Sequence, residues 1–308
     1  MKATLICPGA QCALPVLVEQ TPLVTLPFLG KTVLETWLVH LCGLGIHDVT
    51  IHAADRPDRI LAIVGDGERW GLNVQVIASD AGHTPRTKPE MGPFQNGQSR
   101  SVDPPNDRKT GYPDDVIMID HLPGEPEVKI FESYESWFRA FQRWLPHAVT
   151  PDRVGVRQIH PGVYVGLNSR IPRSATLNPP CWIGDRVFLG NEAQIGPMAV
   201  LENEAMVERK ARVFDSIIGP ETLVGRGTSV FHSLAWGELL IDWRTGSSLR
   251  ISDAFLLSPL RKRKPSREIS RVGDLWSNGN GISTKIQSAS QVSIRQSDHF
   301  LDEPEKVN

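Results

Sequence analysis

Aliphatic side chains recur at every sixth position along much of the second half of the chain. The series runs from Val165 to Val213 and, after one shortened repeat, resumes at Ile218. Its members are Val165, Ile171, Leu177, Ile183, Leu189, Ile195, Leu201, Val207, Val213, Ile218, Val224, Val230 and, in the next turn, Trp236. A period of six fits neither an α-helix nor an amphipathic strand. It is typical of a parallel β-helix, in which each hexapeptide supplies one short strand and one turn and the stacked coils bury the aliphatic column.

A small residue stands four positions after most of these aliphatic residues. The set comprises Ser169, Ala175, Cys181, Ala193, Ala199, Ala205 and Ala211. We expect these residues at corners of the coils, where an inward side chain has little room. Together the two series predict a β-helix domain over residues 159–260.

The first half of the chain alternates between patterns typical of strands and of helices. Strands are predicted over residues 3–7, 49–53, 73–78 and 116–119, and helices over residues 30–45, 56–64 and 134–144. Strands separated by helices form parallel βαβ units, which assemble into a doubly wound α/β sheet. We therefore predict an α/β domain over residues 1–150.

Two segments have a composition that does not favour a packed core. Residues 80–113 are rich in Pro, Gly, Asp, Asn, Arg and Lys, which predicts a mobile or partly disordered loop. Residues 261–308 begin with a basic run and continue rich in Ser, Asn and Gln, which predicts a disordered tail. The basic run fits either a solvated start of that tail or a contact with anionic lipid or an acidic protein face.

Composition and charge indicate which classes of protein this chain is not expected to belong to. A chain of 308 residues is long enough for two domains, and its net charge of −2 does not favour nucleic-acid binding. The four cysteines show no CxxC pair and no metal-ligand spacing, which predicts a reduced, cytoplasmic protein. We expect no signal peptide at the N-terminus. We also expect no transmembrane helix, because no apolar run approaches the roughly 20 residues that span a bilayer.

Several segments match a known pattern of motifs. In the first half these are Thr21-Pro22, the run Leu26-Pro27-Phe28-Leu29-Gly30-Lys31, and Gly65-Asp66-Gly67-Glu68-Arg69-Trp70-Gly71-Leu72. They resemble the sugar-phosphate nucleotidyltransferases, also called NDP-sugar pyrophosphorylases, whose last motif reads GDG-S-x-W-G. Several members append a left-handed β-helix, to which residues 213–219 and 251–260 are similar. The resemblance covers residues 3–80 and 159–260. It implies a truncated nucleotidyltransferase domain, followed by a left-handed β-helix, in nucleotide-sugar or surface polysaccharide metabolism.

The chain departs from this family where the family binds phosphate. Members carry a loop G-G-x-G-T-R-L after the first strand and then a P-K-P lysine, whereas residues 8–15 contain no arginine and Leu23 stands at the lysine position. Loss of one such cation typically costs about 3–4 kcal/mol of transition-state stabilisation, so loss of both costs roughly 10⁴-fold or more in rate. The sugar-binding half is shortened as well. We therefore expect an impaired catalytic domain that acts as a regulatory or scaffold subunit.

The resemblance also implies candidate site residues. Gly9, Ala10 and Gln11 occupy the position of the nucleotide loop, and the alternative interpretation is a turn after a strand that binds no ligand. Asp120 follows the strand 116–119, where the family keeps a magnesium-binding aspartate, and Mg²⁺ is expected only if nucleotide or nucleotide-sugar binding remains. A surface aspartate is the plain interpretation.

Two other functions stay open at this stage. One is an active sugar-1-phosphate nucleotidyltransferase with an atypical phosphate loop. The other is a hexapeptide-repeat acyltransferase that uses His232, two residues after the inward Val230, as an outward-facing base. A surface histidine is the plain interpretation of His232. In every case the β-helix is expected to mediate a homo-oligomer or the binding of a different subunit.

Overall fold

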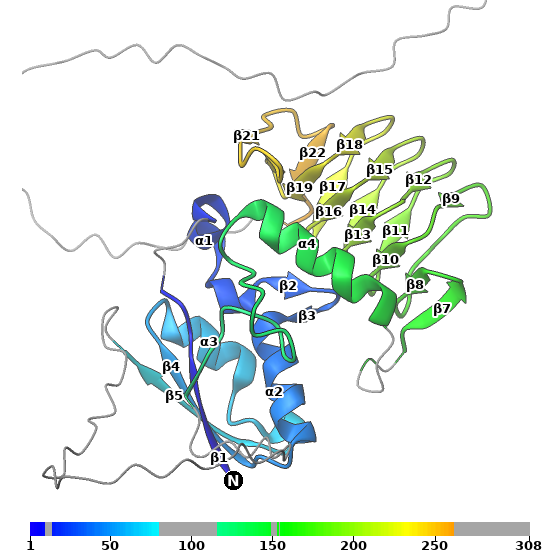
Figure 1. The fold of residues 1–308 in the computed structure, drawn as a ribbon. Coiled ribbons are helices and arrows are strands. Elements are labelled where there is room, and N and C mark those ends of the chain that lie inside the picture. Colours follow the sequence, from blue (N-terminus) through cyan, green and yellow to red (C-terminus); the bar gives the residue numbers. More distant parts are fainter. Residues whose placement is uncertain (10–13, 80–115, 149–152, 154, 262–308) are drawn as a thin grey trace, which may run out of the picture. The chain divides into compact units, whose positions relative to one another are not determined.

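The computed structural model describes residues 1–9, 14–79, 116–148, 153 and 155–261 (Figure 1). It is a mixed α/β structure with parallel sheets and few helices, and it divides into two compact units. The first unit comprises Met1–Leu26 and Lys31–Glu132, and the second comprises Pro27–Gly30 and Ser133–Asn308. The predicted loop 80–113 and, from residue 262 on, the predicted tail lie outside the described residues.

The first unit is built on a four-stranded parallel sheet with the strand order β5-β4-β1-β6. Its strands are β1 (Lys2–Ile6), β4 (Asp48–Ala53), β5 (Asn73–Ala78) and β6 (Val116–Met118). The central strand β1 places Leu5 opposite Ile51 on one side and opposite Ile117 on the other. All four predicted strands are confirmed.

The helices of this unit begin at the signals that the sequence carries for them. In α2 (Val33–Gly43), the Thr32 hydroxyl accepts from the Glu35 amide at 3.0 Å, and the Glu35 carboxylate accepts from the Thr32 amide at 2.8 Å. This reciprocal pair is a capping box. Helix α3 (Pro57–Val64) was also predicted, whereas α1 (Pro15–Gln20) was missed because its six residues are too few to show a period. Short 3₁₀ turns, η1 (Leu23–Thr25) and η2 (Glu68–Trp70), complete the unit.

The GDG segment folds as a tight turn for which a glycine is required. Gly67 has φ +89°, and a Cβ atom there would lie 2.4 Å from the Val74 side chain and 2.7 Å from the Leu72 carbonyl oxygen. Arg69 of the same segment pairs with Glu35 at 2.9 Å. These motif residues therefore have a structural role inside the first unit.

Helix α4 (Tyr134–Trp144) belongs to the second unit, although the sequence placed residues up to 150 in the first domain. Its apolar face packs on Phe28 of β2 (Pro27–Phe28), with ring centroids 4.5 Å apart for Phe141 and 5.8 Å apart for Trp137. The turn η3 (Leu145–His147) follows α4, while β3 (Lys31–Thr32) lies in the first unit. An amphipathic pattern predicts that residues form a helix. It does not predict which of two neighbouring domains the apolar face of that helix packs against.

The repeat region, residues 159–260, contains three parallel sheets that the chain visits in turn. One sheet holds β8 (Val163–Val165), β10 (Cys181–Ile183), β13 (Ala199–Leu201), β16 (Ser216–Ile218) and β19 (Ser233–Trp236). A second holds β11 (Phe188–Leu189), β14 (Met206–Val207) and β17 (Thr222–Val224), and the third holds β9 (Thr176–Leu177), β12 (Gln194–Ile195), β15 (Arg212–Phe214) and β18 (Ser229–Phe231).

The strand register confirms the six-residue period. Ile183 pairs with Leu201, and Leu201 pairs with Ile218, so that each aliphatic residue lies beside the one three hexapeptides later. Nearly all of the column is buried, although Ile171 and Leu177 are only partly so. Of the small residues that were expected at corners, Cys181, Ala193, Ala199, Ala205 and Ala211 are buried as well, and Cys181 and Ala199 are the first residues of β10 and β13.

Antiparallel strands flank the parallel coils. At one end of the first sheet lies β7 (Arg157–His160), and at the other lie β20 (Leu239–Asp242) and β21 (Ser248–Arg250). The strand β22 (Leu257–Pro259) pairs with β17. The next turn of the repeat is present as β19, but Ala235 rather than Trp236 lies beside Ile218 in the buried column, because this coil is again one residue short. After Trp236 the chain reverses at Gly237 (φ +58°) and returns as β20.

Truncation of the aliphatic column should destabilise the repeat region. Ile195 is fully buried, so Ile195→Ala should lower the free energy of unfolding by about 2–5 kcal/mol. Hydrogen exchange of the amides in β12 and β15, measured by mass spectrometry, reports this change. The neighbouring Gln194→Ala is the control, and equal effects of the two variants would contradict the assignment of the column.

Candidate functional site

The first candidate site lies where β1 and β6 end. The two strands are adjacent and parallel, so their carboxyl ends meet at one edge of the sheet, where α/β proteins hold ligands. Gly9 follows β1 and Asp120 follows β6, whereas Ala10 and Gln11 lie outside the described residues. Cys7 also lies at this edge, and burial raises the pKa of its thiol to about 12, so it stays protonated. Nucleotide contact by residues 9–11 stays a prediction.

Asp120 is occupied by neighbouring side chains. Its Oδ1 lies 2.8 Å from Nδ1 of His121, and its Oδ2 lies 3.8 Å from Nζ of Lys129. Among the described residues, no group of three or more His, Cys, Asp or Glu side chains could hold a metal ion. Asp120 is therefore a partner in an ion-pair cluster, and a Mg²⁺ ion would have to compete with both contacts.

An apolar pocket of about 460 Å³ lies beside this cluster. Trp37 and Leu41 of α2 line it, together with Met118 of β6 and His121. The other lining residues are Met1, Lys2, Ala3, His40, Leu44, Ile46, Val116, Ile117, Gly124 and Pro126. The Trp37 indole donates a hydrogen bond of 2.9 Å to the His121 carbonyl, and the two rings meet edge to face at 5.1 Å. Burial lowers the pKa of His40, which favours its neutral form.

The chemistry of this pocket suits binding better than phosphoryl transfer. Among the residues that the structure describes, its lining contains no carboxylate, hydroxyl or thiol side chain that would suit a hard cation. When Nδ1 of His121 donates to Asp120, the other ring nitrogen becomes an acceptor. A weakly polar molecule with one hydrogen-bond donor matches that environment. Sequence reasoning missed His121, although an Asp-His dipeptide directly after a buried strand was a usable signal.

In the second unit a buried carboxylate holds a β-turn. Leu29 and Gly30 both have positive φ, +51° and +83°, which is the conformation of a type I′ turn. Their amides donate to Oε1 and Oε2 of Glu202, each at 2.8 Å. The Arg153 guanidinium donates to the Leu29 carbonyl, and the Asn203 amide donates to the Gly30 carbonyl at 3.2 Å. Every polar backbone atom of the turn's two central residues therefore has a partner in the second unit.

Glu202 is fully buried, and its ionisation is finely balanced. Desolvation raises the pKa of Glu202 to about 7, although the two amide donors and the positive charge of Arg153 act in the opposite direction. The Arg153 guanidinium also lies 5.1 Å from the centroid of the Trp182 ring. Sequence reasoning missed Glu202, because a glutamate beside an aliphatic hexapeptide position gives no sign that it will be buried.

His232 occupies a corner of the coils. Met198, Asp215 and His232 all have positive φ and follow one another at intervals of 17 residues. Nδ1 of His232 lies 3.5 Å from Oδ2 of Asp215, and the imidazole meets the Trp243 ring edge to face at 6.2 Å. The side chain is partly exposed, as expected for an outward position. The structure therefore places His232 at a corner beside Asp215 and Trp243, and a role of His232 as an acyltransferase base stays a prediction.

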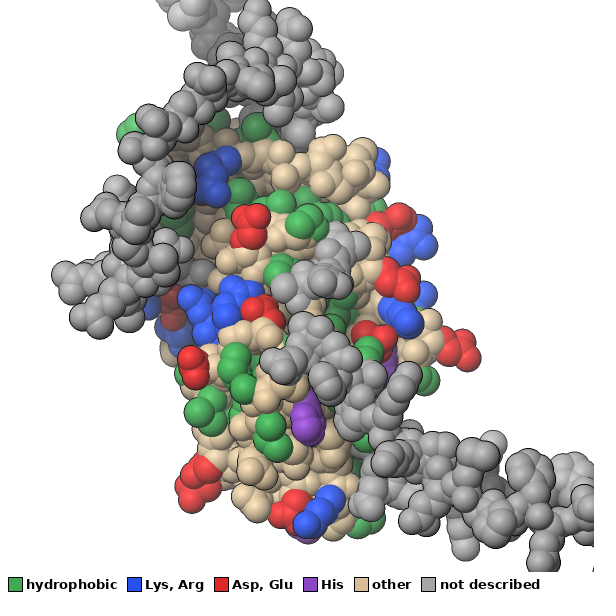
Figure 2. All heavy atoms as spheres, turned by 90° about the vertical axis from the view of Figure 1, so that its left-hand side faces the viewer, with side chains coloured by type: hydrophobic (Ala, Val, Ile, Leu, Met, Phe, Trp, Pro, Cys, Tyr) green, Lys and Arg blue, Asp and Glu red, His purple; other side chains and the backbone are tan. Residues whose placement is uncertain are grey.

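The surface carries charges of both signs. On the face drawn in Figure 2, acidic and basic side chains are interspersed, with hydrophobic ones scattered among them. This pattern agrees with the small net charge of −2. On that face the described residues form no extended field of one sign, so long-range steering of a charged partner is not expected there.

Comparison with known proteins adds no relative. No family model matches the chain, and no curated protein matches it. In the part of the chain that the structure describes, no helix is long and apolar enough to cross a membrane. The functional argument therefore rests on the motifs and on the geometry described above.

The ionisation of Glu202 should make stability depend on pH. Its pKa is about 7 in the folded protein and 4.5 in an unperturbed side chain, so between these values the folded state holds a proton that the unfolded state has lost. Stability should therefore fall as pH rises from 4.5 to 7, by about 3 kcal/mol in total. Urea unfolding at a series of pH values measures this slope.

The Glu202→Gln variant should remove that slope and lower stability at pH 5, because an amide nitrogen facing a backbone N–H leaves one donor without an acceptor. Glu192→Gln, at an exposed corner of the same region, is the matched control. A slope that persists in Glu202→Gln would show that another group titrates.

Proposed function

We propose that this chain is a nucleotidyltransferase-like protein of nucleotide-sugar metabolism that has lost catalysis and acts as a regulatory or scaffold subunit. The observation that carries the proposal is the pairing of Asp120 with His121 and Lys129. In the family that the chain resembles, this position binds magnesium. Here the two carboxylate oxygens already contact His121 and Lys129, so a metal ion would have to displace both contacts.

The position of Leu23 supports the same proposal. In the resembling family a lysine at this position reaches the phosphates, but Leu23 is only 2% exposed and lies in η1 among core residues. No lysine or arginine occurs between Lys2 and Lys31 to replace it. Phosphoryl-type transfer depends mainly on cations placed at the reacting phosphate, so this arrangement favours loss of activity.

The architecture that goes with this function is a truncated doubly wound domain followed by a left-handed parallel β-helix. The sheet order β5-β4-β1-β6 supports the first part, since it is the order in which doubly wound sheets begin. Three parallel sheets visited in turn, with 17 or 18 residues per coil, support the second. The left-handed sense is part of the proposal.

A scaffold role needs a surface for assembly, and the repeat region has a suitable one. Phe188, Met206 and Leu223 lie in register on neighbouring strands of one sheet, on its outward side. Phe188 is 38% exposed, and the other two are partly exposed. We call this row the apolar ladder. Adjacent apolar side chains on a regular sheet are typical of an interface with a second copy or another subunit.

Loss of catalysis can be tested directly. With a nucleoside triphosphate, a sugar 1-phosphate and Mg²⁺, the purified protein should release pyrophosphate at least roughly 10⁴-fold more slowly than an active family member. A coupled pyrophosphate assay measures the rate. Asp120→Asn should leave any residual rate unchanged, and an ordinary rate that this substitution abolishes would overturn the proposal.

Assembly through the apolar ladder predicts a second result. Phe188→Asp should convert an oligomer to monomers without lowering the melting temperature, because the side chain is not part of the core. Size-exclusion chromatography with light scattering measures the mass. Ile159→Asp introduces the same charge at a similarly exposed residue of β7 and should leave the oligomer intact. A monomeric wild-type protein would refute the assembly.

A further inference from the structure

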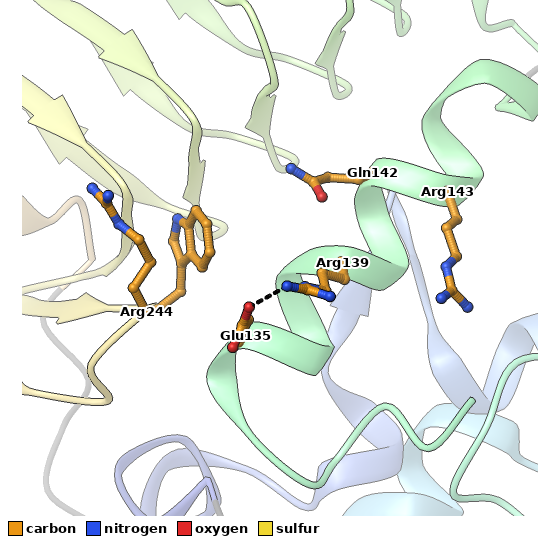
Figure 3. Close-up of a pocket in the computed structure, with 6 residues that line it drawn as sticks. Glu135, Arg139, Gln142, Arg143 and Arg244 are labelled. Carbon is orange, nitrogen blue, oxygen red and sulfur yellow. Dashed lines mark hydrogen bonds and ion pairs between the residues drawn. The ribbon is translucent and has the colours of Figure 1, made fainter. Parts of the chain in front are cut away.

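An arginine-rich cleft of about 520 Å³ lies between α4 and the turn that joins β20 to β21 (Figure 3). Glu135, Arg139, Gln142 and Arg143 line it from the helix, and Trp243 and Arg244 line it from the turn. All six residues belong to the second unit. Neither the motifs nor the proposed function uses any of them.

The wall formed by the turn is rigid. Trp243 stacks on Phe138 with centroids 4.3 Å apart and an angle of 10° between the rings. Its indole donates to the Asp215 carbonyl at 2.9 Å. The Asp242 carboxylate accepts from the Arg244 amide at 2.8 Å, which fixes the backbone from which Arg244 projects. The backbone at Arg244 is therefore held in place, while its side chain is exposed.

The opposite wall is the polar face of α4. Positions 135, 139, 142 and 143 are three or four residues apart, so their side chains share one side of the helix. The other side is buried, with Trp137, Phe138 and Phe141 in the core. In Figure 3 the Arg143 and Arg244 side chains lie on opposite sides of Arg139, and their guanidinium groups point away from one another.

The cleft has an excess of positive charge. Its lining holds three guanidinium groups and one carboxylate, a formal charge of +2, whereas the whole chain carries −2. The carboxylate, Glu135, lies 2.5 Å from Arg139. The Arg244 guanidinium lies 5.6 Å over the Trp243 ring. Guanidinium groups match phosphate oxygens in pairs of parallel hydrogen bonds.

We propose that this cleft binds the phosphate chain of a small polyphosphate-bearing anion. Three guanidinium groups spread over one cleft suit a ligand with two or more linked phosphates, and the volume of the cleft exceeds what a single phosphate needs. Gln142 adds a neutral donor and acceptor. The chain could come from inorganic polyphosphate or from a nucleotide, and both present the same anionic oxygens. The site is independent of the proposed function, because none of its lining residues belongs to the Asp120 cluster or to the apolar ladder.

Titration calorimetry of the full chain with inorganic tripolyphosphate tests the site, with orthophosphate as the shorter probe. We expect saturable binding of tripolyphosphate, at least about tenfold tighter than orthophosphate, because each charge-assisted pair contributes about one factor of ten. Arg244→Gln and Arg143→Gln should each weaken it by about tenfold. Arg157→Gln removes the same charge from an exposed residue of β7 and should have no effect.

The Glu135→Gln variant provides a test of opposite sign. Removal of the carboxylate releases Arg139 and raises the positive charge, so tripolyphosphate should bind several-fold more tightly. ATP in place of tripolyphosphate distinguishes the sources: tighter binding assigns the site to a nucleotide, and equal binding assigns it to the inorganic chain. Absence of binding, or equal loss in Arg157→Gln and Arg244→Gln, would overturn the proposal. Failure of the pyrophosphate-release assay would leave it intact.

Discussion

Each coil of the repeat region has to place its aliphatic side chains directly beside those of the coil before it, and the rest of that region depends on this stacking. The corners require left-handed backbone from residues other than glycine, such as Arg186, Glu204 and Lys210. Each such residue costs about 1 kcal/mol or more. Burial of the continuous column offsets that cost, since an isolated coil would have no partner for its inward side chains.

The same stacking brings unlike charges together at the corners. Arg186 and Glu204 lie one coil apart and meet at 2.5 Å, Glu192 and Lys210 meet at 3.7 Å, and Asp215 lies beside His232. Exposed pairs of this kind add little stability singly. Where two like charges follow one another, at Glu204 and Glu221, the Arg261 guanidinium contacts both carboxylates, at 3.1 and 3.5 Å. His232 belongs to this pattern, because its position in the coil places its imidazole beside the Asp215 carboxylate.

The carboxylates of Glu202 and Asp120 have different structural roles, because they have different partners. Glu202 accepts two backbone amides and so attaches the turn at Leu29 and Gly30 to the repeat region. Asp120 contacts the side chain that follows it directly in the sequence, so its interaction is local. In both cases the partners of the carboxylate, rather than its residue type, decide what it can do.

Local patterns were enough to predict the strands of the first sheet, the helices α2, α3 and α4, and the buried column, because each follows from a period of two, three to four, or six residues along the chain. The contacts of Glu202 join residues more than 170 positions apart, and the arginine-rich cleft joins α4 to Arg244 across about 100 positions. No local period carries such information. The sequence by itself determined which side chains are inward, because hydrophobic burial acts at each position. Only the tertiary structure decided which polar groups meet, because hydrogen bonds and ion pairs depend on distances that folding alone creates.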